Sequence, residues 1–230
     1  MLKLKLNEND LNTANLYLRP DSVARISKLM PTAVDITARC QPERGRVEAF
    51  IRAVYVRAYK ADIAVSYPIL MSVRDAGGTI LAAVGFRYAK EEPLFLENYT
   101  GAPIEQVLRT PRERIAEIGN LASAGGGASI FLFAALASYL NFKGIDYATV
   151  TGTDYLHRTF KKLGLNPQKI CDASLEAVQS DGQNWGSYYD TRPRVLAGSV
   201  PHSVSRLKKA LGVEYQDCCP RLFPRLHFRT

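Results

Sequence analysis

Residues 115–142 read IAEIGNLASAGGGASIFLFAALASYLNF, and this stretch decides the fold class. Its first part, residues 115–122, is predicted to be a β-strand. Three consecutive glycines follow at residues 125–127. The apolar run at residues 130–142 then predicts a buried helix, and Gly144 ends it. Strand, glycine loop and helix therefore occur in this order.

The glycine loop is suited to bind an anion. Glycines let backbone N–H groups approach a phosphate closely, and the N-terminus of the following helix adds a favourable dipole. No Gly-Lys-Ser/Thr follows the loop, and the full Gly-x-Gly-x-x-Gly pattern is absent, so it is neither a Walker loop nor a dinucleotide fingerprint. The loop is interpreted as a phosphate cradle, with a flexible surface turn as the alternative.

Glu117 lies among apolar neighbours in the strand before the loop, on the opposite face from Ala116 and Ile118. A carboxyl group in such surroundings has a raised pKa and serves as a base near neutral pH. The alternative is a salt bridge to an arginine such as Arg87. Gly119 is interpreted as a bulge that leaves backbone N–H groups free for a developing oxyanion.

The flanking sequence supplies the other elements. Residues 42–60 have apolar positions at spacings of three and four, which predicts an amphipathic helix. Two strand-like runs, 69–74 and 79–89, are separated by Asp-Ala-Gly-Gly at residues 75–78, which predicts a β-hairpin. The remaining predicted elements are a short helix at 103–108, a strand at 147–151 and a basic amphipathic helix at 154–163.

Length and composition favour one domain with extensions: 230 residues, 47% hydrophobic and 23% charged. We expect an N-terminal extension at residues 1–30, which shows no long periodic element, a core domain at 31–200, and a basic C-terminal tail at 201–230. No apolar run reaches the roughly 20 residues that span a bilayer, and no secretory signal is visible, so no transmembrane segment and a cytoplasmic location are expected. Cysteine and histidine spacings predict no metal site.

The tail carries half of the net charge of +8, since six basic residues against two acidic ones leave +4. Dense positive charge suits an anionic membrane, a phosphorylated cofactor, nucleic acid or an acidic carrier protein, and the alternative is a solvated surface that aids solubility. The tail has no recognisable motif for reading nucleic acid, so a nucleic-acid partner is not expected.

Two further features have an open interpretation. Arg87 and Glu97 are suited to bind a zwitterion: Arg87 would bind the carboxylate of the ligand and Glu97 its ammonium group. The alternative is a structural ion pair between the two residues. Trp185, the only tryptophan, lies in an aromatic cluster that is typical of either a core or a pocket.

Several segments together resemble one family. They are PLFLENY at residues 93–99, EIGNLA at 117–122, TGT at 151–153 and WGSYY at 185–189. They resemble the thermostable haemolysin family of the GNAT acyltransferase superfamily, across about residues 35–200. The family also resembles the acyl-homoserine-lactone synthases. Those enzymes have an Arg where this chain has Asn120, which argues against a homoserine-lactone product.

The resemblance implies an α/β fold with a twisted, mostly antiparallel sheet that opens between the Glu117 strand and the strand at 147–151. It also implies an acyltransferase that moves an acyl group from a thioester to an amino acid or a similar small amine. The donor is acyl-coenzyme A or acyl carrier protein with its acyl-phosphopantetheine, used as a co-substrate, so no cofactor is bound permanently.

The resemblance assigns site residues too. It implies Glu117 as the catalytic base, helped by Glu97, with backbone N–H groups near residues 119–121 holding the oxyanion. The residues implied for the acceptor are Arg87, Tyr99 and Asn120. Those implied for the donor are Leu121, Ala122, Gly125, Gly126, Gly127, Ala128 and Ser129. Ala122 or Ser123 stands where GNAT loops usually open with Gln or Arg, and Phe160 stands where a Tyr often protonates the leaving thiolate.

The alternative function belongs to another class: a membrane-active lytic protein without catalysis, as the family's name suggests. The sequence lacks an amphipathic barrel pattern and a spanning helix, although the basic tail is suited to anionic lipid. The oligomeric state has no signature in the sequence.

Overall fold

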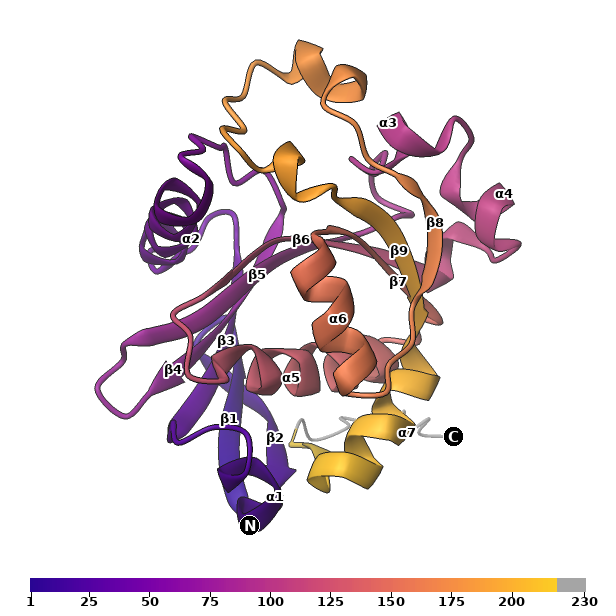
Figure 1. Cartoon of the computed structure of the whole chain (residues 1–230). Helices are drawn as coiled ribbons and strands as arrows, with labels where there is room; N and C mark the ends of the chain where they lie inside the picture. The colour runs from indigo at the N-terminus through magenta and orange to yellow at the C-terminus, as the bar shows by residue number, and fades with distance from the viewer. Residues whose placement is uncertain (219–230) are drawn as a thin grey trace, which may run out of the picture.

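The computed structural model describes residues 1–218, apart from the side chains of residues 179–181. Ten strands form a single sheet in the order β10-β2-β1-β3-β4-β5-β6-β7-β9-β8 (Figure 1). The strands are β1 (Leu2–Glu8), β2 (Leu11–Leu18), β3 (Pro31–Ala38), β4 (Ile69–Asp75), β5 (Ile80–Tyr88), β6 (Ile115–Ser123), β7 (Tyr147–Gly152), β8 (Gln168–Asp172), β9 (Arg194–Ser199) and β10 (Glu214–Asp217).

Neighbouring strands are antiparallel except for two parallel pairs, β1 with β3 and β6 with β7. The predicted class, a mostly antiparallel sheet flanked by helices, is therefore confirmed. β6 and β7 pair only from Ile115 with Tyr147 to Ile118 with Val150. Beyond Ile118 and Val150 the residues of β6 and β7 are not paired with each other, so the sheet opens between the two strands, as expected.

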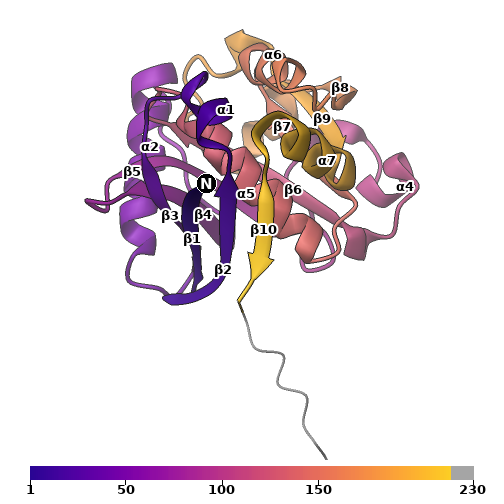
Figure 2. The ribbon, with the colours of Figure 1, turned by 90° about the horizontal axis from the view of Figure 1, so that it is seen from below.

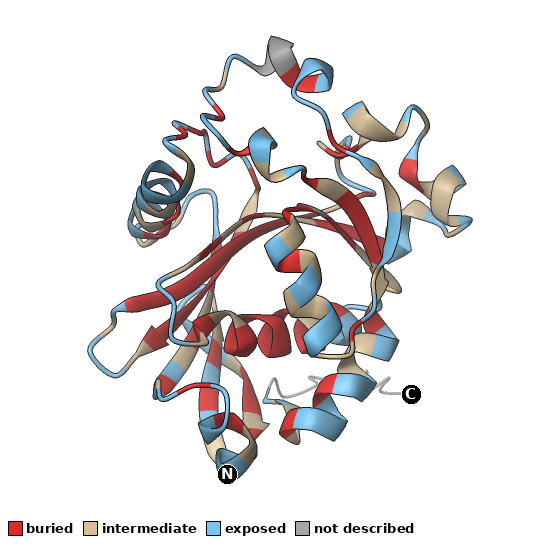
Figure 3. Ribbon diagram, in the orientation of Figure 1, coloured by how far each residue is buried: buried red, intermediate tan, exposed pale blue. Residues whose placement is uncertain are grey.

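Helices cover both faces of the sheet. They are α1 (Pro20–Ala24), α2 (Arg44–Tyr59), α3 (Glu97–Thr100), α4 (Ile104–Leu108), α5 (Ala128–Phe142), α6 (Asp154–Lys162) and α7 (Val200–Leu211). Figures 1 and 2 show α5 and α7 on one face and α2 on the other. α5 and the middle of the sheet are the most deeply buried parts (Figure 3). The apolar side chains of this helix form one core cluster with side chains of the strands from β1 to β6 and of α7.

The predicted elements around the glycine loop are confirmed to within a few residues, including the hairpin of β4 and β5. The N-terminal segment differs from expectation, because residues 1–30 contain β1 and β2. In β1, Leu4 and Leu6 are buried while Lys3 and Lys5 are exposed. This period of two is the mark of a half-buried strand, and it is too short to stand out as a long periodic element.

The C-terminal tail begins as α7, and β10 then pairs with β2 at the edge of the sheet. The rest of the basic tail, residues 219–230 with Arg221, Arg225 and Arg229, lies outside the described residues. Binding of an acidic carrier protein by this tail therefore stays a prediction, with the solvated surface as its alternative. Within residues 1–218, no helix has both the length and the apolar character to cross a membrane.

Candidate functional site

The site begins at an irregularity in β6. Gly85 of β5 pairs with Gly119 and Ala83 pairs with Ala122, so two residues of β6, Asn120 and Leu121, face a single residue of β5. This is a β-bulge, and Asn120 takes a positive φ of 50° within it. The expected bulge therefore exists, one residue after Gly119. It lies where β6 parts from β7.

Three hollows meet at this opening. The upper pocket, on the α2 face, is bounded by Tyr55, Tyr67, Phe95, Tyr99, Trp185 and Tyr188. The central cleft is bounded by Leu121, the three loop glycines, Ser129 and Tyr155. The apolar cavity, between α5, α6 and the sheet, is bounded by Leu132, Leu136, Leu140, Ala148, Phe160 and Val200.

Shared wall residues connect the three. Gly119, Asn120 and Thr151 line both the upper pocket and the central cleft. Leu121, Phe133 and Leu156 line both the central cleft and the apolar cavity. A molecule in the central cleft thus reaches a polar and aromatic pocket in one direction and an apolar one in the other.

The glycine loop forms one end of the central cleft. Gly125, Gly126 and Gly127 all have positive φ, at 99°, 62° and 84°. The Ser27 hydroxyl donates a hydrogen bond of 2.6 Å to the carbonyl oxygen of Gly126, so the segment after α1 holds the loop in place. This backbone conformation is one that glycine adopts without strain. Of the other residues expected at the donor, Leu121 and Ser129 line the cleft, whereas Ala122 and Ala128 are buried in the core clusters.

Six buried side-chain polar atoms lack a hydrogen-bond partner among the described residues, and two of the six lie at the opening. They are Oδ1 of Asn120 and Oγ1 of Thr151. Buried polar atoms in folded proteins are nearly always hydrogen-bonded, so an orphaned pair at one place points to a ligand that satisfies them. Asn120 was expected at the acceptor, whereas nothing in the sequence marked Thr151 beyond its place in the family's motif.

Glu117 lies beside the upper pocket with 1% of its surface exposed. Its Oε2 accepts a hydrogen bond of 2.9 Å from the backbone N–H of Phe95, and its Oε1 accepts one of 2.8 Å from that of Leu96. Nε of Arg87 lies 3.3 Å from Oε2. Burial raises the pKa of the carboxyl to about 7, although the Arg87 charge and the two N–H groups oppose the rise. Both interpretations of Glu117, a group that titrates near neutrality and an ion pair with Arg87, are therefore present together.

Arg87 does not pair with Glu97, contrary to the expected pairing. Its Nη1 lies 3.2 Å from Oε1 of Glu92, its guanidinium lies 4.3 Å from the centre of the Tyr67 ring, and it is absent from the residues that line the upper pocket. The pairing differs because β5 places Arg87 opposite Glu117 in the sheet register, which the spacing in the sequence does not reveal.

Glu97 is held elsewhere by Arg112. Its Oε1 lies 2.6 Å from Nη1 of Arg112 and its Oε2 lies 2.9 Å from Nη2. The same carboxylate accepts hydrogen bonds from the backbone N–H groups of Leu94 and Ile104. Burial alone raises the pKa of Glu97, but the bonds from Arg112 and the two N–H groups outweigh it and bring the pKa to about 2. Glu97 thus fixes the turn whose next two N–H groups hold Glu117.

We expect Glu97→Gln to lower the free energy of unfolding by about 1–3 kcal/mol at pH 7, because a charge-assisted pair and a backbone acceptor are lost. A carboxylate whose pKa falls on folding stabilises the fold above its unfolded pKa, and this contribution is lost as the pH falls toward 2. Denaturant unfolding at pH 7 and at pH 3 measures the difference, which should shrink at the lower pH.

Glu105→Gln is the matched control for this prediction. Glu105 contacts the same Nη1 of Arg112 at 2.6 Å, but its side chain is 34% exposed against 18% for Glu97. A smaller loss is expected there, since exposed ion pairs contribute little. The assignment would be contradicted if both variants lost the same free energy of unfolding, or if the loss from Glu97→Gln were the same at pH 7 and pH 3.

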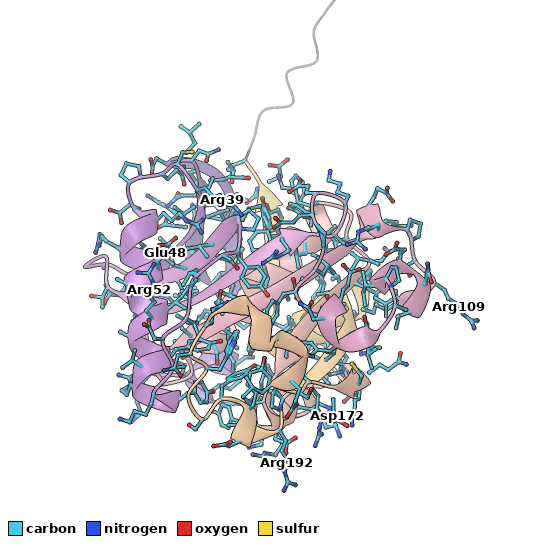
Figure 4. All side chains as sticks on the ribbon, turned by 90° about the horizontal axis from the view of Figure 1, so that it is seen from above. Arg39, Glu48, Arg52, Arg109, Asp172 and Arg192 are labelled. Atoms are coloured by element: carbon cyan, nitrogen blue, oxygen red, sulfur yellow. The ribbon has the colours of Figure 1, made fainter. Side chains whose placement is uncertain are left out.

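The aromatic cluster around Trp185 lines the upper pocket and also forms part of the α2 core, so both interpretations of it apply. The hydroxyls of Tyr99 and Tyr189 lie 2.6 Å apart, and the Tyr188 hydroxyl donates to the carbonyl oxygen of Thr151 at 3.2 Å. Among the described residues that line the pocket, none is charged. In the view onto this face, Arg109 and Arg192 extend outward from the body of the molecule (Figure 4).

Sequence reasoning missed Tyr67, Gly85 and Tyr55. Tyr67 lies just before β4, and its ring crosses β5 and β6 over two glycines: a Cβ at Gly85 would come 2.6 Å from Cβ of Tyr67, and one at Gly119 would collide with its hydroxyl. Gly85 in the middle of a strand was the signal that was available, because glycine inside a strand often marks a close approach.

Comparisons with known proteins agree with this fold. A family model described as thermostable hemolysin matches residues 37–204. The solved structure of FeeM, an N-acyl amino acid synthase from uncultured soil microbes, is 17% identical and covers 76% of this chain and 95% of its own, with a TM-score of 0.54. BjaI, a CoA-dependent acyl-homoserine lactone synthase solved with SAM and isopentyl-CoA, is 12% identical and covers 78% and 89%, with a TM-score of 0.55.

TofI, solved in a ternary complex with an inhibitor and MTA, is 14% identical and covers 76% of this chain and 96% of its own, with a TM-score of 0.54. A search of curated protein sequences found no match. At these low identities the likeness establishes the fold, and the chemistry has to be argued from the residues of this chain.

Proposed function

The chain belongs to the thermostable hemolysin family, and from this premise we propose that it transfers an acyl group from a thioester to the nitrogen of a small amine. One observation carries the proposal. The glycine loop and the apolar cavity meet the upper pocket where β6 and β7 separate, so a phosphate-bearing acyl donor and a small polar acceptor fit on the two sides of one opening.

The donor lies along the central cleft in this proposal. Its phosphates are held at Gly125, Gly126 and Gly127, where backbone N–H groups and the N-terminus of α5 favour negative charge. Its acyl chain enters the apolar cavity, whose lining residues are almost all apolar. The donor is coenzyme A or the phosphopantetheine of an acyl carrier protein, since both present the same thioester arm. The acyl chain is a fatty or polyketide chain.

The acceptor, an amino acid or a similar amine, binds in the upper pocket against Tyr99 and Asn120. Glu117 takes the proton that the acceptor nitrogen loses, because its raised pKa matches the working pH. Arg87 and Glu97 act by position: Arg87 pairs with Glu117, and Glu97 fixes the turn that supplies the Phe95 and Leu96 N–H groups.

The bulge stabilises the transition state. Attack of the nitrogen on the thioester carbon moves negative charge to the carbonyl oxygen, and preorganised N–H groups lower the energy of that charge. Asn120 and Leu121 have no partner residue in the register of β5 or β7, so the bulge backbone faces the opening. Collapse of the intermediate breaks the carbon–sulfur bond and releases the thiol.

Thiol release from acyl-coenzyme A and from acyl carrier protein, measured with a panel of amines and amino acids, tests the proposal. Mass spectrometry of the products, including acyl products co-purified from the host, identifies both substrates. Dye leakage from anionic liposomes is measured in parallel. Leakage without acceptor-dependent thiol release would overturn the acyltransferase proposal in favour of a lytic protein.

A further inference from the structure

We infer that Tyr67 is a catalytic residue, which carries the proton from the acceptor nitrogen to Glu117. This inference rests on the proposed acyltransferase function and adds a residue to it. It follows from where the upper pocket ends, where the Glu117 carboxylate lies, and what stands between them.

The Glu117 carboxylate does not reach the pocket by itself. It is almost completely buried, and its two oxygens face the backbone N–H groups of Phe95 and Leu96 and the guanidinium of Arg87. Glu117 is also absent from the residues that line the upper pocket. An acceptor in that pocket therefore has no direct contact with the group that is to receive its proton.

Tyr67 fills this gap. Its side chain lines the upper pocket, and its ring packs on the guanidinium of Arg87, which in turn pairs with Glu117. The tyrosine, the arginine and the glutamate thus form one contiguous cluster. Among the interactions of the described residues, the Tyr67 hydroxyl has no hydrogen-bond partner, so it is available to a substrate.

Two glycines place that hydroxyl at the opening. The ring lies across Gly85 and Gly119, and side chains at either position would overlap it. Gly119 lines both the upper pocket and the central cleft, and the bulge residue Asn120 follows it. The hydroxyl therefore lies where the acceptor nitrogen and the thioester carbon have to meet. Glycine is required at both Gly85 and Gly119, because a single methyl group at either residue would displace the Tyr67 ring.

A relay through one water connects the Tyr67 hydroxyl to Glu117. The hydroxyl lies against Gly119, and Glu117 projects from the same face of β6 two residues earlier. A single water that hydrogen-bonds to both the hydroxyl and the carboxylate completes the path. Burial, and then the Glu117 charge, raise the pKa of Tyr67 well above its usual value. The phenol is therefore protonated before the reaction, and it releases its own proton only as it accepts another.

The step balances as follows. The acceptor enters as an ammonium ion and gives one proton to the Tyr67 oxygen, while the Tyr67 proton passes through the water to the Glu117 carboxylate. The freed nitrogen lone pair forms the carbon–nitrogen bond, and the carbon–sulfur bond breaks with its electrons on sulfur. A second proton of the nitrogen neutralises the thiolate. The products are amide, thiol and protonated Glu117, which returns its proton to solvent.

Tyr67→Phe tests the relay, because it removes the hydroxyl and keeps the ring that packs on the glycines and Arg87. With acyl-coenzyme A and an amine acceptor we expect kcat to fall about 100-fold, with the KM of the donor unchanged. With hydroxylamine, which is uncharged at neutral pH and needs no first deprotonation, the loss should be only a few-fold. Tyr139→Phe is the control, since Tyr139 is equally buried and its hydroxyl donates to Glu8 on the other face of the sheet.

A second variant leaves the hydroxyl in place and moves it. Gly119→Ala introduces a methyl group against the Tyr67 hydroxyl, and we expect a comparable loss of kcat with the amine. Full amine activity in Tyr67→Phe, or in a folded Gly119→Ala, overturns the relay, as does an equal loss with amine and hydroxylamine. In each of these cases an active wild type leaves the proposed function standing. A wild type that releases no thiol with any acceptor overturns both.

Discussion

Glu117→Gln is expected to lower kcat by about two to four orders of magnitude, the range for loss of a general base. The substitution keeps the size of the side chain and removes its ability to take a proton. The N–H groups of Phe95 and Leu96 bind different oxygens of Glu117, and Gln keeps an acceptor oxygen for one of them, so circular dichroism has to show that the variant is folded. Steady-state thiol release with saturating donor and acceptor measures the change, and an unaltered kcat would remove Glu117 from the mechanism.

The pH dependence of the wild type checks the same assignment. The base acts in its ionised form, and burial raises the pKa of Glu117 to about 7. The rate should therefore rise with pH through about 7 and level off above it, and the Gln variant should lose this rise. Glu92→Gln is the matched control: Glu92 pairs with the same Arg87, at 3.2 Å, but its side chain is 31% exposed against 1% for Glu117. A Glu92→Gln variant as slow as Glu117→Gln would mean that the Arg87 pairing matters and the base does not.

Gly126→Val is expected to raise the KM of the donor about tenfold or more while changing the KM of the acceptor little. Valine at a φ of 62° is strained, by about 1–3 kcal/mol, and its Cβ would lie 3.3 Å from Leu29. The loop then loses the conformation that presents its N–H groups to phosphate, and each 1.4 kcal/mol of lost binding is a factor of ten. Separate titrations of donor and acceptor measure the two constants.

Gly144→Val supplies the control, since it strains the same backbone region at the other end of the same helix. Gly144 has a φ of 79°, and an added Cβ there meets nothing within 4 Å. We expect lower stability from it and an unchanged KM for the donor. Equal rises of both Michaelis constants in Gly126→Val would instead indicate a general structural role for the loop.

The local patterns of the sequence were sufficient for the order of the elements around the site. The short strand-like run at residues 115–122, the glycines at 125–127 and the apolar run after them predicted β6, the loop and α5 to within a few residues. Each of these signals is carried by neighbours in the chain, because strand and helix periods are set by local backbone geometry. The two N-terminal strands escaped notice because each is short, and in β2 the buried residues Ala14, Asn15 and Leu16 follow one another and do not alternate with exposed ones.

The sequence by itself determined that Glu117 lies in an apolar strand ahead of a glycine loop, and hence it predicted that a carboxyl group and the loop are close together. Only the tertiary structure decided that Arg87 pairs with Glu117, that Arg112 takes Glu97, and that Tyr67 crosses two glycines to the opening. These contacts join segments far apart in the chain. They depend on strand register and on packing between layers, and neither leaves a periodic trace in the sequence.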